Sequence, residues 1–190
     1  MVKLDKIYTK TGDGGTTRLS TGEPVAKHGP RVSAYGSVDE LNAALGVAAL
    51  HADGEMAAAI ARIQNDCFDL GADLATPERD KPLEWEPLRV TLAQVERLET
   101  EIDAMNGQIP PLDSFVLPGG SALSAHLHMA RTIARRAERD VTFLAAQAGE
   151  IVSDAARAYI NRLSDWLFVA ARAANGNGAG DVKWVPGANR

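Results

Sequence analysis

Cysteine and long hydrophobic runs are what this sequence most clearly lacks. Cys67 is the only cysteine among 190 residues, so no disulfide can form within the chain and we expect a reducing compartment. Within QNDCFDLGADL, Cys67 is predicted to be a small core residue rather than a nucleophile. No segment approaches the roughly 18 apolar residues of a membrane span, and the first ten residues lack the apolar core of a signal peptide. We therefore expect a cytoplasmic protein without a membrane span.

An excess of positive charge is also missing. The chain has 20 Lys and Arg residues against 25 Asp and Glu residues, which gives a formal net charge of -5. This balance disfavours a general affinity for nucleic acid or for an anionic membrane surface. Any anion site must therefore be local. With 45% hydrophobic residues, the chain is long enough for one compact domain with a sizeable core.

Strand signals are scarce, whereas helical periodicity and capping residues recur. The pattern predicts helices at about 37–51, 55–74, 91–105, 121–148 and 153–174. Ser37 with Glu40, and Thr91 with Gln94, match the capping-box spacing at the start of the first and third helices. Ser121 is the expected cap of the fourth helix, and Ser153 or Asp154 that of the fifth. The predicted fold class is all-α, an up-and-down, ferritin-like bundle of five helices.

The predicted single domain, residues 1–190, begins with a glycine-rich head. Residues 1–36 form this head, 37–174 the helical bundle and 175–190 a C-terminal tail. In TKTGDGGTTR the glycines let backbone N–H groups approach an anion, while threonine hydroxyls and the charges of Lys10, Arg18 and Lys27 add to a phosphate-binding composition. The Walker A pattern GxxxxGK[ST] and a βαβ unit are both absent. A mobile N-terminal tail is the alternative interpretation.

The fourth predicted helix carries arginines at four-residue intervals in RTIARRAER. Apolar residues from 123 to 144 at alternating steps of four and three predict a seam that packs against other helices. Arg131, Arg135 and Glu138 form a polar stripe beside that seam. Arginines four residues apart repel by a few tenths of a kcal/mol, and a bound triphosphate or a partner's carboxylates would turn this into attraction through bidentate contacts. A solvated arginine-rich face is the alternative.

The fifth predicted helix has an asparagine in its middle. Asn has poor helix propensity, so the amide of Asn161 is expected to hydrogen-bond to a definite partner. Arg162 and Asp165, three residues apart, are expected to form an intrahelical ion pair.

Five segments together resemble one known family. They are YTKTGDGGTTRLSTGE, SVDELNAALG, FVLPGG, RTIARRAERDV and YINRLSDWLFVAAR, and in this order they resemble the ATP:cob(I)alamin (corrinoid) adenosyltransferases of the helical-bundle type over residues 7–172. The resemblance implies a homotrimer with active sites between subunits. It also implies transfer of the 5′-deoxyadenosyl group of ATP to cob(I)alamin, giving adenosylcobalamin and triphosphate. Mg²⁺, a flavin-dependent reductase and an adenosylcobalamin-dependent enzyme are the expected cofactor and partners.

The resemblance also implies roles for individual residues. Arg135, Phe115 and Asn161 are the implied catalytic residues, with Phe115 beneath the corrin ring of cobalamin, where it displaces the lower axial ligand. Asp39 and Arg131 are implied to pair across the subunit interface, and no protein ligand for a metal is implied. The implied ATP-binding residues are Thr9, Lys10, Thr11, Gly12, Thr17, Arg18, Lys27, Arg135, Glu138, Arg139 and Asn161.

One position departs from the family pattern, and two other classes of protein stay open. A lysine that follows TGD in some members is Gly14 here, so its phosphate contact falls to Arg18 or to a metal ion. The first alternative class is a small-molecule kinase, although no candidate base stands out. The second is a non-catalytic bundle that senses nucleotide or carries a corrinoid. The sequence leaves open whether residues 176–190 order over the corrin.

Overall fold

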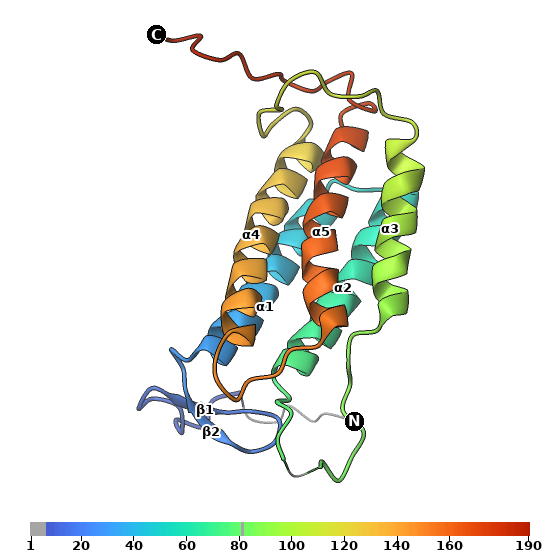
Figure 1. Ribbon diagram of the computed structural model, residues 1–190. Coiled ribbons are helices and arrows are strands. Elements are labelled where there is room, and N and C mark those ends of the chain that lie inside the picture. Colours follow the sequence, from blue (N-terminus) through green and yellow to red (C-terminus); the bar gives the residue numbers. More distant parts are fainter. Residues whose placement is uncertain (1–6, 81) are drawn as a thin grey trace.

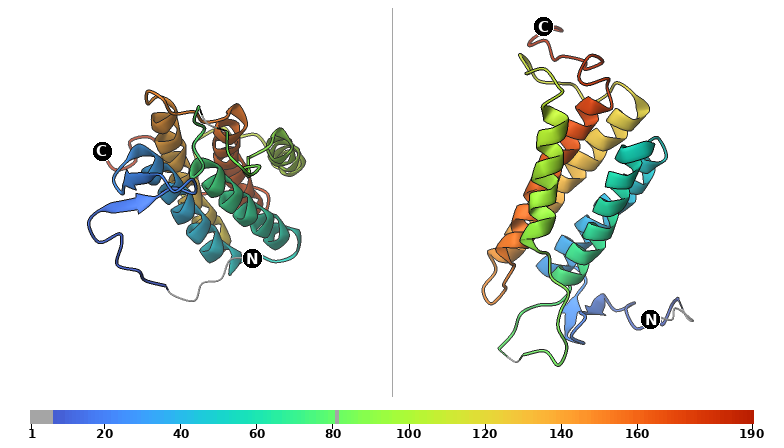
Figure 2. Two further views of the ribbon diagram at one scale, coloured as in Figure 1. Left: turned by 90° about the horizontal axis from the view of Figure 1, so that it is seen from below. Right: turned by 90° about the vertical axis from the view of Figure 1, so that its right-hand side faces the viewer.

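Five helices and one small sheet make up the computed structural model, which describes residues 7–80 and 82–190 (Figure 1). Successive helices run in opposite directions, which confirms the predicted all-α, up-and-down bundle. The β-hairpin lies at one end, here called the head end; the loop between α3 and α4 and the C-terminus lie at the other, the tail end (Figure 2). The elements are β1 (Thr16–Arg18), β2 (Pro24–Ala26), α1 (Pro30–Ala49), α2 (Gly54–Leu74), α3 (Leu92–Asn106), α4 (Ala122–Ala145) and α5 (Asp154–Ala173).

The packing of α1 against α4 is the most extensive contact between helices, followed by α4 against α5. The apolar residues of the predicted seam on α4, from Leu127 to Leu144, are fully buried, whereas Leu123 at its start is only partly buried. Cys67 is also in the core, and burial raises the pKa of its thiol to about 12, which confirms that it is a structural residue. None of the helices in the described part of the chain is long and apolar enough to cross a membrane.

Two predicted helix ends were wrong. α1 begins at Pro30, with Gly29 as its N-cap, because proline suits the first turn of a helix, where its missing N–H leaves no bond unmade. Ser37 therefore lies inside α1, and its hydroxyl donates to Asp140 of α4 instead of capping the helix. α4 ends at Ala145 rather than near residue 148.

The expected capping residues of the later helices are confirmed. Thr91 and Gln94 form a capping box at the start of α3. Ser121 Oγ and Ser153 Oγ accept backbone N–H bonds at the starts of α4 and α5. These local hydrogen bonds set where each helix begins.

The head folds into an antiparallel hairpin, although the sequence analysis predicted only loop there. Thr17 of β1 lies opposite Val25 of β2. The hairpin is attached to the end of α2, where Ser20 Oγ donates to the carbonyl of Ala75 (2.9 Å) and lies 2.7 Å from Thr76 Oγ1. The head is therefore held against the bundle.

A network of charged side chains also attaches the head. Glu150, in the loop before α5, pairs with the buried Arg31 and with Arg79 (3.1 Å), and Arg79 reaches Glu23 before β2 (3.3 Å). Burial opposes the ionisation of Glu150, but the hydrogen bonds and charges of Arg31 and Arg79 outweigh it and hold its pKa below the usual value. The ionised carboxylate therefore links the start of α1, the loop after α2 and the hairpin.

Replacing Glu150 with Gln is expected to lower the free energy of unfolding by about 1–3 kcal/mol at pH 7, because hydrogen bonds to charged groups contribute about that much. The pKa of Glu150 is lower in the folded than in the unfolded chain. Its stabilising effect is therefore full above the usual value of 4.5 and is lost as the pH falls through the folded pKa.

Urea unfolding of both proteins from pH 7 down to pH 3.5 tests this expectation. The difference between them should shrink as the pH falls. Glu96→Gln is a matched control, because Glu96 is exposed and its side chain has no recorded partner among the described residues. A difference that stays constant over the pH range would contradict the assignment.

Candidate functional site

A cavity of about 530 Å³ in the head, here called the head cavity, brings together six of the seven head residues expected to bind ATP. Lys10 is the exception: it does not line the cavity, and it has a left-handed backbone conformation (φ 61°). Two cations and several hydroxyls on a glycine-containing loop are the composition of an anion site. The cavity is lined by Thr9, Thr11, Gly12, Thr16, Thr17, Arg18, Pro24 and Lys27.

Contacts within the head fix Lys27 beside the glycine loop. Its backbone N–H donates to Gly15 (2.9 Å), and its ammonium lies so close to Gly12 that a Cβ there would be 3.0 Å from Nζ. Arg18 Nη1 donates to the carbonyl of Gly22 (2.8 Å), so one side of its guanidinium holds the hairpin turn. The glycine-rich loop is therefore folded around the ammonium group of Lys27.

A polar cluster joins α4 and α5 near their middle. Asn161 Nδ2 donates to Glu138 Oε1 (2.8 Å), which confirms that this mid-helix amide has a definite partner. Arg135, one turn before Glu138, is exposed. Arg139 is also exposed and donates to the carbonyl of Arg135 (3.0 Å). Arg135, Glu138 and Asn161 thus lie close together on one surface.

A second cavity of about 400 Å³, here called the arginine cavity, lies between α3, α4 and α5. Arg131 is half-buried there, and burial together with the charge of Arg135 lowers the pKa of its guanidinium. Its Nε has no hydrogen-bond partner in the described part of the chain. Two arginines without enough local negative charge favour an anionic ligand or partner. The lining residues are Ile102, Asn106, Arg131, Arg135, Ser164, Asp165, Phe168 and Val169.

His128, one turn before Arg131 on the polar stripe of α4, is buried more deeply than the half-buried stripe predicts. It is 1% exposed, and neither ring nitrogen has a hydrogen-bond partner among the described residues. Burial, and then the charge of Arg131, lower the pKa of the imidazole, which favours the neutral form at pH 7. Its ring packs edge-on against Phe168 (centroids 6.2 Å apart), a residue of the arginine cavity.

Other charged residues of α1, α4 and α5 have partners of their own or lie apart from Arg131. Asp39 is exposed on α1, and no ion pair joins it to Arg131 within the described chain. Arg136 pairs with Glu40 of α1. The expected pair between Arg162 and Asp165 exists at 3.6 Å, but the contact of Arg162 with Glu99 of α3 is shorter, at 2.9 Å.

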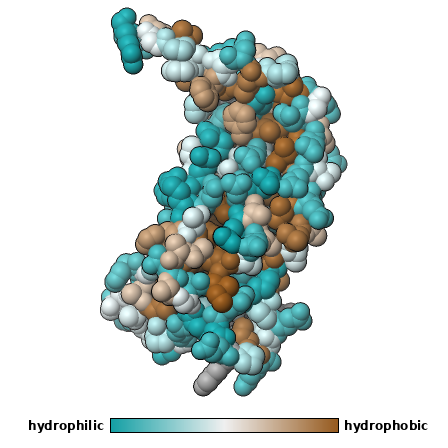
Figure 3. All heavy atoms as spheres, in the orientation of Figure 1, coloured by the Kyte–Doolittle hydropathy of each residue, from teal (hydrophilic) through white to brown (hydrophobic). Residues whose placement is uncertain are grey.

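Phe115 lies at the tail end and is 77% exposed. The C-terminal segment is ordered against it: the N–H of Trp184 donates to the carbonyl of Phe115, and the N–H of Leu117 donates to Val182, both at 2.8 Å. The Trp184 ring contacts the Phe115 ring edge-on with centroids 6.0 Å apart. At the tail end, Figure 3 shows hydrophobic residues interspersed with polar ones on the surface. Trp184 was missed because nothing in the sequence of the tail indicates its pairing.

A buried network of hydrogen bonds holds the C-terminal tail in place. Asp181 accepts from Arg172 Nε (2.7 Å) and from Asn175 Nδ2 (3.2 Å). Asn175 Oδ1 in turn accepts from the N–H of Ser121 (2.9 Å). Any side chain at Gly120, whose φ is 91°, would overlap the Asn175 carboxamide, so glycine is required there.

The three candidate regions do not converge within one chain. The head cavity lies at the head end and Phe115 at the tail end (Figures 1 and 2). At a rise of about 1.5 Å per residue, Arg135 is about 20 Å along α4 from its start near Phe115 and about 15 Å from its other end. The three regions are therefore spread along the length of the bundle.

Comparison with known proteins places this geometry in a family. The cobalamin adenosyltransferase family model matches residues 7–174. The corrinoid adenosyltransferase of Mycobacterium tuberculosis is 49% identical over 191 residues, covering 100% of this chain and 97% of that protein. That of Bacillus subtilis is 42% identical over 185 residues, covering 94% of this chain and 92% of that protein.

Solved structures give the same result. A variant PduO-type ATP:corrinoid adenosyltransferase from Lactobacillus reuteri, complexed with cobalamin and ATP, is 38% identical with a TM-score of 0.83, covering 94% of this chain and 99% of that chain. Another variant of that enzyme, complexed with ATP, has a TM-score of 0.85 at 38% identity and covers 95% and 100%. On both sequence and structure, this chain belongs to the cobalamin adenosyltransferase family.

Proposed function

We propose that the protein transfers the 5′-deoxyadenosyl group of ATP to cob(I)alamin, forming adenosylcobalamin and inorganic triphosphate. The observation that carries this proposal is the pairing, on this family's scaffold, of a preformed anion cavity around Lys27 with an exposed aromatic surface at Phe115. The first suits the triphosphate and the second suits a corrin face. The Lactobacillus reuteri relative was solved with both substrates.

The proposed reaction needs positioning and charge stabilisation rather than a protein base. Cob(I)alamin is itself a strong nucleophile that attacks C5′ of the ribose, and triphosphate leaves with the bonding electrons. The protein has to align the two substrates and stabilise the charge that grows on the leaving group. Lys27, Arg18 and the amides and hydroxyls of the head cavity are assigned to the phosphates. Arg135, Glu138, Arg139 and Asn161 are assigned to the nucleotide.

The proposed assembly is a homotrimer with each active site between adjacent subunits. The separation of the head cavity from Arg135 along the bundle supports this arrangement, because subunits packed side by side could bring a head cavity and an Arg135 from different chains to the same ATP. Asp39, exposed and unpaired among the described residues, is assigned to Arg131 of a neighbouring subunit. That pair would supply the negative charge that the arginine cavity lacks.

Phe115 is assigned to the lower face of the corrin. An apolar ring there excludes water and the lower axial ligand from cob(II)alamin, and the resulting four-coordinate centre is easier to reduce. Trp184 is assigned to hold the Phe115 ring in place. A flavin-dependent reductase as electron donor, an adenosylcobalamin-dependent enzyme as recipient and a cytoplasmic location complete the proposal, and the lone, buried Cys67 suits a reducing compartment.

Mg²⁺ is proposed to be bound mainly by triphosphate oxygens and water. Among the described residues, no group of three or more His, Cys, Asp or Glu side chains is placed to hold a metal ion. Mg²⁺ retains water readily and needs few protein ligands. When bound, it would neutralise part of the charge of the triphosphate beside Lys27.

Incubation of the purified protein with ATP, Mg²⁺ and chemically reduced cobalamin is expected to form a Co–C bond. The spectrum of adenosylcobalamin should appear with one triphosphate released for each product molecule. ADP as the product would favour the kinase alternative. Absence of any transfer by a protein that binds both substrates would favour a sensor or a corrinoid carrier.

Replacing Arg135 with Ala is expected to lower kcat/KM for ATP by about 10²-fold, the usual effect of removing one group that stabilises transition-state charge. The fold should be unaffected because Arg135 is exposed. Arg157→Ala is the matched control, since Arg157 is an arginine of α5 whose recorded ion pair is with Asp154. Steady-state kinetics with ATP varied measure the effect, and wild-type kcat/KM in Arg135→Ala would sink the assignment.

Replacing Phe115 with Ala is expected to spare ATP binding and to slow turnover from cob(II)alamin with a reductase. Turnover from chemically prepared cob(I)alamin should fall less, because that route bypasses the reduction step. Trp184→Ala should shift both rates in the same direction by a smaller factor, since it leaves the Phe115 ring present but less restrained. Equal losses from cob(I)alamin and cob(II)alamin would refute the role given to Phe115.

A further inference from the structure

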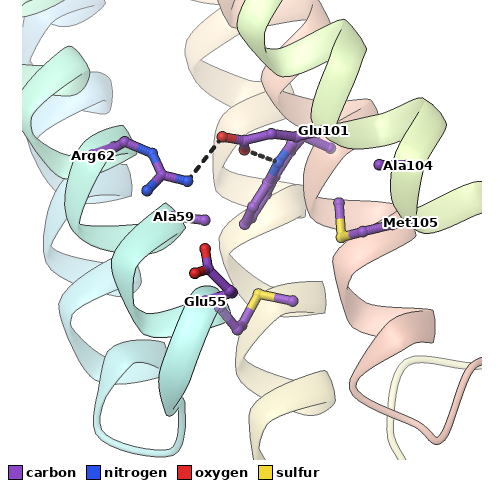
Figure 4. Close-up of a pocket in the computed structure, with 8 residues that line it drawn as sticks. Glu55, Ala59, Arg62, Glu101, Ala104 and Met105 are labelled. Carbon is purple, nitrogen blue, oxygen red and sulfur yellow. Dashed lines mark hydrogen bonds and ion pairs between the residues drawn. The ribbon is translucent and has the colours of Figure 1, made fainter.

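A third cavity, here called the indole cavity, opens between α2 and α3 (Figure 4). Its volume is about 210 Å³, and it shares no lining residue with the head cavity or the arginine cavity. Its position makes it independent of the active site proposed above. It is lined by Glu55, Met56, Ala59 and Arg62 of α2, Glu101, Ala104 and Met105 of α3, and Trp166 of α5.

Polar side chains, rather than close helix packing, connect α2 to α3 beside the cavity. Asp66, near the middle of α2, pairs with Arg97 and accepts from Gln94 (3.0 Å), both in the first two turns of α3. Towards the tail end the facing residues include Ala59 and Ala104. Their short side chains do not fill the gap, and the space between the helices stays open.

The floor of the indole cavity is a fixed aromatic ring. Trp166 is 1% exposed, and its Nε1–H donates to Glu101 Oε2 (2.8 Å). Arg62 donates to the other oxygen of Glu101 (3.0 Å). Met56 and Met105 also line the cavity. An indole ring together with two polarizable thioethers favours an apolar, especially an aromatic, ligand.

The charge at the cavity edge is negative. Both oxygens of Glu101 already have partners, whereas Glu55 has no recorded partner among the described residues. With Arg62 as the single cation of the lining, two carboxylates leave a net negative charge. Figure 4 shows the Glu55 side chain beside Ala59, across the gap from Met105. A cationic ligand fits this edge and an anionic one does not.

We propose that the indole cavity binds a small organic ammonium ion, with an aromatic or branched aliphatic body over Trp166 and the ammonium group at Glu55. Buried apolar cavities of about 150 Å³ accept a benzene-sized ligand, so 210 Å³ is enough for one ring and a short chain. Nucleotides are too large and carry the wrong charge.

The test uses 2-phenylethylammonium as the probe and the full chain with methyl-labelled methionines. The methyl signals of Met56 and Met105 are expected to shift in a saturable way. Met129, an exposed methionine of α4 outside the cavity, provides the internal control. Neutral 2-phenylethanol should bind more weakly at the same place. Equal shifts at Met129, or equal affinity for the alcohol, would overturn the proposal.

Two variants separate charge from shape. Glu55→Gln should weaken binding of the ammonium probe about two- to fivefold, as expected for an exposed ion pair, without changing binding of 2-phenylethanol. Glu96→Gln on α3 is the matched control and should bind both probes as wild type does. Ala104→Phe, at an exposed rim position, should fill the cavity and abolish binding of both probes, and unchanged binding would refute the site.

Adenosyl transfer serves as an independent readout. Ala104 is outside the regions assigned to ATP and cobalamin, so Ala104→Phe should retain transfer activity while losing probe binding. A protein that binds the probe without transferring the adenosyl group would contradict the proposed function and leave the indole cavity assignment intact.

Discussion

The close packing of α1 against α4 is the contact on which the rest of the structure depends. Ala130, Ala134 and Ala137 are completely buried along α4, and such small side chains let two helices approach closely. This packing fixes the rotation of α4 about its axis. Arg131 and Arg135 are consequently directed to the arginine cavity, whereas Arg136 is directed to Glu40 of α1. The core seam thus decides which arginines are available to a ligand.

The position of the charged stripe on α4 follows from that rotation. The electrostatic repulsion within the stripe favours binding of a ligand or a subunit that carries negative charge. Burial and a neighbouring arginine both disfavour the charge of Arg131, and one chain offers the stripe few carboxylates. Glu138 is already bonded to Asn161. The fold therefore retains repulsion that it could have avoided with neutral residues. Such retained repulsion is typical of sites where a ligand or another subunit provides the opposite charge.

Features that depend on local sequence could be predicted, and features that depend on distant contacts could not. The capping box at Thr91 and the seam on α4 follow from spacing within one or two turns of helix. The helix propensity of Asn161 predicted that its amide has a partner, but not that the partner is Glu138 of α4. The start of α1 at Pro30 was missed because Gly-Pro pairs also occur in loops. The hairpin depends on α2, and the place of Trp184 depends on a loop 70 residues earlier. Contacts between segments so far apart in the sequence leave no periodic pattern of apolar residues from which they could be predicted.

The hydrogen bonds that hold the C-terminal tail through Asn175 and Asp181 have a consequence for the order in which the protein folds. Residues 113–117 leave the ribosome before α4 and α5, but the segment that pairs with them, residues 182–184, emerges after both helices. Arg172 and Asn175 must already be in place when Asp181 arrives. The surface around Phe115 is therefore completed only after all five helices have been synthesised.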